Sequence, residues 1–306
     1  MTDTVLATKG LTKRYGNHLA ADRVELTVGK GQIYGLVGRN GAGKTTIIRM
    51  VSAQTVPTAG EIFLFGATGK ELSRMRARTG VMVETPSFYP YLTARQNLEY
   101  YRIQRGVPGK GTVDQVLEEV DLADTGKKTF KNFSLGMKQR LGLALALMNR
   151  PDFLLLDEPI NGLDPEGIVE FRNLLLKLNR ERQTTILISS HILPELANLA
   201  TCYGFIDNGV MLEQISAQAL EEKCRACIEA RVDDPSAAAL VLEQRLNIRD
   251  YEVLPGNLLR LYQELDRPQA VAKALVEGGV GLLSIESRGA NLEDYFLSMI
   301  GGVRHA

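Results

Sequence analysis

Short apolar runs alternate with amphipathic stretches over the first two thirds of the chain. Several runs are continuously apolar, as expected for strands that are covered on both faces. The stretches between them have helical periodicity. This alternation predicts an α/β fold with a mostly parallel sheet. The predicted strands are Ile33–Val37, Glu61–Phe65, Val81–Glu84, Phe153–Asp157 and Thr184–Ser189. The predicted helices are Lys44–Ala53, Pro165–Asn179 and Leu193–Ala200.

One long segment interrupts this alternation. Three helices and no strand are predicted in it, at Thr93–Arg105, Val113–Val120 and Leu135–Met148. Gly106, Pro108, Gly109 and Gly111 indicate a loop within the segment. The simplest account is a helical subdomain, at about residues 90–148, inserted between two strands of the sheet.

The last third of the chain follows a different pattern, with the order β-α-β-β-α-β of a ferredoxin-like unit. A final helix follows this unit. We therefore expect two domains, residues 1–215 and a C-terminal α+β accessory domain at 216–306, which could serve regulation, dimer contact or structural capping. The predicted elements are strands Cys227–Val232, Tyr251–Leu254, Leu258–Tyr262 and Leu282–Ser287, and helices Pro235–Leu246, Arg267–Glu277 and Leu292–Ile300.

Charge and composition exclude several classes of protein. The 306 residues carry 36 basic and 36 acidic side chains, whereas a protein that wraps nucleic acid has a basic excess. No apolar run is long enough to span a bilayer, and Met1–Thr12 lacks a secretory signal pattern. We therefore expect a cytoplasmic chain. Cys224 and Cys227 have the C-x-x-C spacing, but no second pair or nearby histidine completes a zinc site, so we interpret them as reduced.

A phosphate-binding loop follows the strand Ile33–Val37 and precedes a helix. Its glycines let backbone N–H groups turn toward phosphate oxygens, and the helix N-terminus adds partial positive charge. Lys44 supplies a charge for the β- and γ-phosphates, and Thr45 supplies a hydroxyl for Mg²⁺. The loop consists of Gly38, Arg39, Asn40, Gly41, Ala42, Gly43, Lys44, Thr45 and Thr46.

A second nucleotide motif ends the apolar strand Phe153–Asp157. Ligands bind at the carboxyl ends of strands in open α/β sheets, so Asp157 is placed to hold Mg²⁺. Glu158 follows at the tip of the strand and is the best candidate to orient or deprotonate the attacking water.

Residues Phe133–Arg140 separate this chain from other phosphate-loop enzymes. They read Phe-Ser-Leu-Gly-Met-Lys-Gln-Arg and resemble the LSGGQ signature of the ABC transporter ATPase family. Ser134 and Gly136 keep the key positions, while Leu135 and Met137 depart from the commonest form. A serine and backbone N–H groups at a helix start can hold a γ-phosphate. The resemblance covers roughly the first 215 residues and implies a head-to-tail homodimer, in which the signature binds ATP on the opposite subunit.

Three smaller matches follow the family order. The Asn161–Asp164 segment resembles the loop through which the two subunits communicate. His191 resembles the switch histidine that contacts the γ-phosphate. Tyr15 resembles the aromatic residue that stacks on adenine. Each has an ordinary alternative, namely a surface turn, a strand-end histidine and a core tyrosine.

Glu84 stands where the family usually has a glutamine that reaches toward Mg²⁺ and the lytic water. Together with the signature and a C-terminal Leu292–Phe296, it makes nearly the whole chain resemble the bacitracin-resistance and lantibiotic-immunity branch. A carboxylate at this position could bind Mg²⁺ but would repel the γ-phosphate. Whether Glu84 acts in catalysis or in coupling therefore stays open.

The resemblance implies an ATP-binding and ATP-hydrolysing exporter subunit at the cytoplasmic face of the membrane, with Mg²⁺ and a separately encoded polytopic permease. The expected cargo is a peptide antibiotic such as bacitracin or a lantibiotic. Another cargo, such as a drug, lipid or ion, is an alternative. A soluble ABC ATPase acting on ribosomes or DNA is a further one, disfavoured by the single cassette and the balanced charge.

The segment from Thr85 to about Arg105 is the expected docking region for the permease. Phe88, Tyr89 and Tyr91 form an aromatic run in it that we expect to be exposed. The alternative is that these aromatic side chains pack between the sheet and the helical subdomain.

Overall fold

A computed structural model of the chain describes residues 4–83, 87–109, 111–289, 295 and 299. The chain divides into two compact units, Met1–Ala217 and Gln218–Ala306, against an expected boundary at residue 215. Within the described ranges, every helix is too short or too polar to cross a lipid bilayer.

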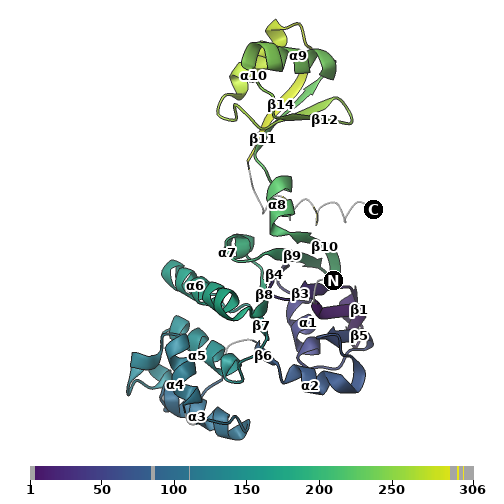
Figure 1. Ribbon diagram of the computed structural model, residues 1–306. Coiled ribbons are helices and arrows are strands. Elements are labelled where there is room, and N and C mark those ends of the chain that lie inside the picture. Colours follow the sequence, from purple (N-terminus) through teal and green to yellow (C-terminus); the bar gives the residue numbers. More distant parts are fainter. Residues whose placement is uncertain (1–3, 84–86, 110, 290–294, 296–298, 300–306) are drawn as a thin grey trace. The chain divides into compact units, whose positions relative to one another are not determined.

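The first unit is built on a six-stranded sheet in which five strands are parallel, as predicted (Figure 1). The strands pair in the order β10-β9-β4-β8-β7-β6, and only β10 is antiparallel to its neighbour. Every residue of β4, β7 and β8 is buried, which explains their apolar sequences. The strands are β4 (Ile33–Val37), β6 (Thr79–Met82), β7 (Phe153–Asp157), β8 (Thr185–Ser190), β9 (Cys202–Asp207) and β10 (Val210–Ser216).

A smaller antiparallel sheet shares its core with the central sheet. Helix α1 (Lys44–Val51) contributes Ile47, Ile48 and Met50 to this common core. Of the four strands, sequence patterns predicted only β5. In β1, irregularities in the pairing with its three partners interrupt the alternation of the strand. The strands are β1 (Thr4–Tyr15), β2 (His18–Val24), β3 (Thr27–Gly29) and β5 (Ala59–Leu64).

The predicted helical insertion between β6 and β7 is confirmed. Helix α5 packs against β6, which is the edge strand of the central sheet, and Figure 1 shows α3, α4 and α5 gathered at that edge. Thr93 and Gln96 form a capping box that starts α3. The helices are α3 (Ala94–Gln104), α4 (Thr112–Glu119) and α5 (Leu135–Leu147), with short 3-10 helices at Ala123–Thr125 and Phe130–Asn132.

The remaining helices of the first unit connect strands. Helix α6 follows β7 and is capped by Asp164, with Pro165 in its first turn. Helix α7 follows β8 and ends earlier than the predicted Ala200. These helices are α2 (Leu72–Arg76), which follows a 3-10 turn at Gly69–Glu71, α6 (Pro165–Arg182) and α7 (Leu193–Ala197).

The second unit has the predicted ferredoxin-like topology. Its strands pair antiparallel in the order β12-β13-β11-β14. Helices α9 and α10 pack together and share a core with the sheet. The predicted last helix, Leu292–Ile300, lies outside the described residues except at Tyr295 and Met299. The elements are α8 (Ala217–Lys223), β11 (Cys227–Val232), α9 (Pro235–Leu246), β12 (Tyr251–Leu254), β13 (Leu258–Leu261), α10 (Pro268–Glu277) and β14 (Leu282–Arg288).

The two cysteines of the C-x-x-C segment flank the start of this sheet. Cys224 directly follows α8, and Cys227 begins β11. Both are free thiols and nearly buried. Burial raises the pKa of each thiol above its ordinary value, which disfavours the reactive thiolate.

Candidate functional site

The loop between β4 and α1 has a backbone path that only glycine permits at two positions. A Cβ at Gly38 would lie 2.5 Å from the carbonyl oxygen of Ile206, and one at Gly43 would lie 2.4 Å from that of Ala20. Gly43 also has a φ of +108°. It offers no side chain to cap α1, so the positive end of this helix faces the loop and can attract an anion.

Lys44 lies at the start of α1 and is only 4% exposed. Its Nζ donates to the carbonyl oxygens of Gly38 at 2.7 Å and Arg39 at 3.1 Å. The same ammonium lies 3.1 Å from Glu158 Oε1. The loop therefore folds around a buried positive charge that is paired with the predicted catalytic carboxylate.

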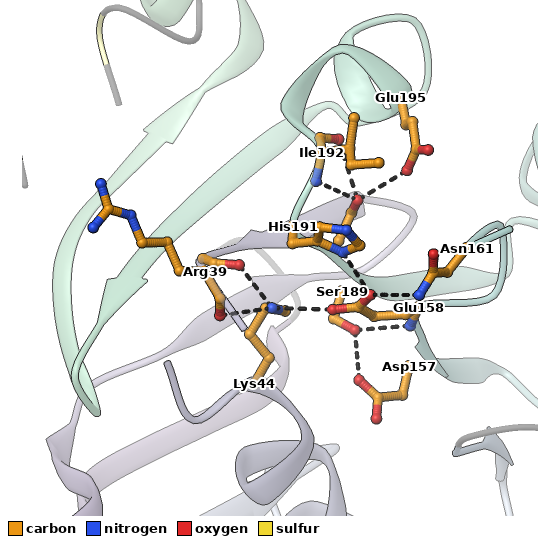
Figure 2. Close-up of polar contacts among 11 residues, drawn as sticks. Arg39, Lys44, Asp157, Glu158, Asn161, Ser189, His191, Ile192 and Glu195 are labelled. Carbon is orange, nitrogen blue, oxygen red and sulfur yellow. Dashed lines mark hydrogen bonds and ion pairs between the residues drawn. The ribbon is translucent and has the colours of Figure 1, made fainter. Parts of the chain in front are cut away.

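Glu158 comes directly after β7, and its carboxylate has polar contacts with the side chains of Lys44, His191 and Asn161 (Figure 2). His191, after β8, places Nδ1 2.6 Å from Glu158 Oε2. Because an ionised carboxylate only accepts, Nδ1 carries the hydrogen and donates it. Asn161 Nδ2 donates to the same oxygen at 3.4 Å. The structure thus brings together Lys44, Glu158 and His191, as sequence reasoning expected.

Two consecutive serines at the end of β8 were not among the predicted site residues. Ser189 Oγ donates to Asp157 Oδ1 at 2.6 Å and accepts from the backbone N–H of Glu158 at 2.9 Å. Ser190 Oγ accepts from the N–H of Ile192 at 2.9 Å and lies 3.0 Å from Glu195 Oε2. A pair of small hydroxyl residues directly before a motif histidine is the signal that could have identified them.

Glu195 lies in α7 behind His191. Burial raises the pKa of this carboxyl group, and the charge of Glu158 adds to the effect. The hydrogen bond from Ser190 and the nearby His191 oppose this increase in pKa. Glu195 therefore holds the turn that carries His191 through its contact with Ser190. Its charge also interacts with those of Glu158 and His191.

Most of the other predicted residues of the phosphate loop, and the predicted adenine contact, lie at accessible or half-buried positions. Arg39, Asn40 and Gly41 are exposed, Ala42 is buried, and Thr45 and Thr46 are half-buried in the first turn of α1. Tyr15 ends β1 and is 45% exposed, with Lys13 Nζ 4.9 Å from its ring centroid. An exposed aromatic ring at this place can present a flat face to a base.

The signature residues lie in a different pocket. Ser134 is exposed and caps α5 by accepting a hydrogen bond from Met137 N at 3.3 Å. Ser134 and Gly136 line a shallow surface pocket of about 760 Å³ together with Gly162 and Asp164 of the predicted communication loop. The structure therefore groups the signature with that loop, and Lys44 and Glu158 are not among the residues lining this pocket.

In the predicted docking segment, two of the three aromatic residues that were expected to be exposed are exposed. Glu84 and Thr85 lie outside the described residues. Tyr89 and Tyr91 are exposed, at 45% and 75%. Phe88 was expected to be exposed, and this was wrong, because its ring is 8% exposed and packs against Tyr101 and Phe130.

The donor set suits a magnesium nucleotide. Asp157 and Thr45 offer hard oxygen ligands of the kind that Mg²⁺ prefers. Lys44 and the uncapped start of α1 supply positive charge at the loop. The two glycines keep side chains away from the backbone of this cradle. The residues present therefore fit a triphosphate with a bound divalent cation.

Comparison with known proteins points in the same direction. Residues 21–161 match the family model described as ABC transporter. The chain is 44% identical over 300 residues to the bacitracin transport ATP-binding protein BcrA of Bacillus licheniformis, an alignment that covers 98% of both chains. It is 41% identical over 212 residues to the lantibiotic transport ATP-binding protein SrtF of Streptococcus pyogenes, covering 69% of this chain and 90% of that one. The dimeric structure of a bacterial ABC transporter cassette is similar with a TM-score of 0.62 and 25% identity, covering 69% of this chain and 98% of that one.

Proposed function

This chain belongs to the family of ABC transporter ATP-binding proteins, and from that premise we propose that it powers removal of a peptide antibiotic of the bacitracin or lantibiotic type. As an ABC ATPase it hydrolyses ATP, and this hydrolysis is coupled to transport. The proposal about the transported compound rests on one observation. The similarity to the bacitracin transport protein extends over both units of the chain, well beyond the nucleotide motifs.

The site residues have distinct proposed roles in binding Mg-ATP. The loop from Gly38 to Thr46 and the start of α1 hold the triphosphate, and Tyr15 stacks on the adenine. Phosphate oxygens compete with Glu158 for the ammonium of Lys44. Thr45 and Asp157 would hold Mg²⁺, and the bound ion would supply positive charge against the phosphates.

Glu158 is the proposed general base for the attacking water. When Lys44 turns to the phosphates, the Glu158 carboxylate loses one of its two closest partners and becomes available to a water molecule. His191 then remains 2.6 Å away to keep the carboxylate oriented. The ion pair between Lys44 and Glu158 is thus the contact that nucleotide binding would replace.

ABC cassettes dimerise and work with a membrane permease. For this chain we propose a head-to-tail homodimer, in which Ser134 and Gly136 of one subunit bind the γ-phosphate held by the other. The dimer would lie at the cytoplasmic face of the membrane, bound to a separately encoded permease through the segment that holds Tyr89 and Tyr91.

Two variants test the assignment of the ATP site. Lys44→Ala should abolish tight ATP binding, because it removes the buried charge of the loop. Glu158→Gln should keep ATP binding and lower the hydrolysis rate by about 10²–10⁴, because it removes the base. Equilibrium binding of a fluorescent ATP analogue and phosphate release measure the two effects. Hydrolysis at the wild-type rate by Glu158→Gln would remove Glu158 from the mechanism.

A resistance assay tests the cargo. The chain, produced in a sensitive bacterium together with its permease, should raise the inhibitory concentration of bacitracin or a lantibiotic. The Glu158→Gln variant should abolish this protection while both subunits are still present. If the complex hydrolyses ATP normally but protects against neither peptide, the chain exports a different class of compound.

A further inference from the structure

Ser189 is a polar residue in a central, fully buried strand. It lies in β8 between β4 and β7, where the parallel register pairs it with Leu36 on one side and Asp157 on the other. Its side chain is 0% exposed, and Asp157 beside it is 5% exposed. A hydroxyl at such a place is costly unless its hydrogen bonds are satisfied. Its two bonds both go to the residue pair Asp157 and Glu158.

The direction of these bonds is fixed by the chemistry of the hydroxyl group. A serine carries one hydrogen, which goes to Asp157 Oδ1 at 2.6 Å, the distance of a charge-assisted O–H···O⁻ bond. A lone pair of the same oxygen accepts a hydrogen bond from the backbone N–H of Glu158 at 2.9 Å. Holding Oδ1 in this way sets the plane of the Asp157 carboxylate, and therefore the direction of its other oxygen.

The second bond acts on a backbone conformation that needs support. Glu158 has a φ of +46°, in the left-handed region that residues other than glycine rarely adopt. The backbone N–H of this residue donates the hydrogen bond that Ser189 Oγ accepts. In this conformation the Glu158 carboxylate reaches both Lys44, at 3.1 Å, and His191, at 2.6 Å.

We propose that Ser189 is a positioning residue for ATP hydrolysis, orienting both the Mg²⁺-binding carboxylate of Asp157 and the base Glu158 through one hydroxyl group. This inference rests on the proposed roles of Asp157 and Glu158. Removal of a group that orients a metal-binding carboxylate typically costs about 10–100-fold in metal affinity or activity.

Valine and threonine at position 189 provide the test, because they have nearly the same shape and differ in the hydroxyl group. In the full-length chain with ADP bound, Mn²⁺ affinity is measured by electron paramagnetic resonance, independently of catalysis. Ser189→Val should weaken Mn²⁺ binding by about 10-fold or more and lower kcat by about 10–100-fold. Ser189→Thr should recover most of both. Fluorescent nucleotide binding without metal should be similar in the two variants.

A matched control lies in the same strand. Thr185 is also buried, and its hydroxyl accepts a hydrogen bond from Gly31 N at 2.9 Å, away from the carboxylates. Thr185→Val therefore removes a buried hydroxyl group of β8 and should lower the melting temperature without changing Mn²⁺ affinity.

Equal Mn²⁺ affinity and kcat in the Ser189→Val and Ser189→Thr proteins would overturn the proposal. If the added methyl group prevents folding, Ser189→Ala compared with wild type gives the same test without added volume. Absence of metal-dependent nucleotide binding in the wild-type chain would instead contradict the proposed site itself. The two failures are therefore distinguishable.

Discussion

Glu158 is the residue at which the polar contacts of the nucleotide site converge. An ammonium at 3.1 Å and an imidazole nitrogen at 2.6 Å hold its two carboxylate oxygens, and Ser189 holds its backbone. Lys44 belongs to α1, whereas Ser189 lies in β8 and His191 directly follows that strand. When Lys44 turns to the phosphates, His191 still contacts the carboxylate and Ser189 still holds the backbone, so Glu158 loses little further freedom when it acts on a water molecule.

The residues of this site differ in how far sequence could predict them. Lys44 and Glu158 belong to contiguous motifs whose chemistry can be read within a few residues. The role of Ser189 depends on the register of two parallel strands, since its partner Asp157 is 32 residues away. Glu195 gains its contact with Ser190 only when α7 packs back over the end of β8. The two hydroxyl residues before His191 mark the position of the serines, but the linear sequence does not show which side chains they contact.

The raised pKa of Glu195 predicts a pH dependence of stability. The folded chain binds this proton more tightly than the unfolded chain, so the free energy of unfolding falls as pH rises from the ordinary pKa of 4.5 through the raised value. Glu195→Gln removes this dependence while keeping an acceptor for Ser190. In thermal unfolding from pH 4 to 8, wild type should lose stability relative to the variant as pH increases.

His191 and Glu158 also face Glu195, so the comparison needs a control for loss of a charge. Glu221→Gln, at an exposed position of α8, removes one negative charge without changing the site. A difference in melting temperature between wild type and Glu195→Gln that stays constant over the whole pH range would contradict the prediction.

At the scale of elements, the turn before α3 is held by one buried side chain. Asn97 is 0% exposed; its Oδ1 accepts from Tyr89 N at 2.8 Å, and its Nδ2 donates to the carbonyl oxygens of Tyr89 and Thr93 at 3.1 and 3.0 Å. These bonds fix a turn that buries Phe88 and exposes Tyr89. Sequence predicted the helix from its periodicity, but a loop has no period, so the direction of each aromatic ring could not be predicted.

The exposed ring of Tyr89 leads to a prediction about permease docking. Tyr89→Glu should leave the purified chain folded and hydrolysing ATP, because the ring is 45% exposed and packs only edge-on against Tyr100 among the described aromatic rings. The charge should nevertheless stop co-purification with the permease. Tagged pull-down from detergent extract, together with the melting temperature, measures both effects.

Phe88→Ala is the matched variant for the packing alternative. Truncating this buried ring should cost about 3–5 kcal/mol and lower the melting temperature by several degrees or more. If Tyr89→Glu destabilises the chain to the same extent, then Tyr89 also serves packing, and the docking assignment is wrong.

Local turn chemistry explains why the elements of the second unit were predicted closely. The β12–β13 hairpin turns at Gly256 and Asn257, which have φ values of +82° and +58°. Glycine and asparagine are the residues that tolerate this region, so the turn is encoded where it occurs. Strand β1 is less regular, because register shifts interrupt its pairing with the adjacent β2 and with β5, which lies more than 40 residues further along the chain.

At the scale of the whole molecule, the two units have separate apolar cores. The core of the second unit is formed by β11, β13, α9 and α10, and includes Ile228, Leu242, Leu261 and Leu275. Among the described residues, each unit thus buries apolar side chains in a core of its own. The nucleotide site and the signature pocket both lie within the first unit.

The signature residues Ser134 and Gly136 line a pocket that does not include Lys44. We therefore predict that ATP bound at Lys44 of one chain brings a second chain to it through the signature. The Glu158→Gln chain should form a dimer with ATP, because this variant keeps nucleotide bound. Adding Ser134→Arg should prevent it, since a bulky cation would occupy the start of α5. Ser73→Arg, on the exposed part of α2, is the matched control and should dimerise normally. Light scattering measures the mass, and a dimer that persists with Ser134→Arg would contradict the shared site.

The register of the central sheet also sets when this chain can fold during its synthesis. Ile33 N, at the start of β4, donates to Thr201 Oγ1 across 168 residues. Its paired neighbours β8 and β9 likewise emerge late. At roughly 5–20 residues per second, a ribosome takes on the order of ten to thirty seconds to cover that distance. Until β8 has been synthesised, the apolar strand β4 has neither of its paired neighbours and is open to aggregation. A nascent chain stalled before Thr185 therefore displays the whole phosphate loop without either strand that pairs with β4.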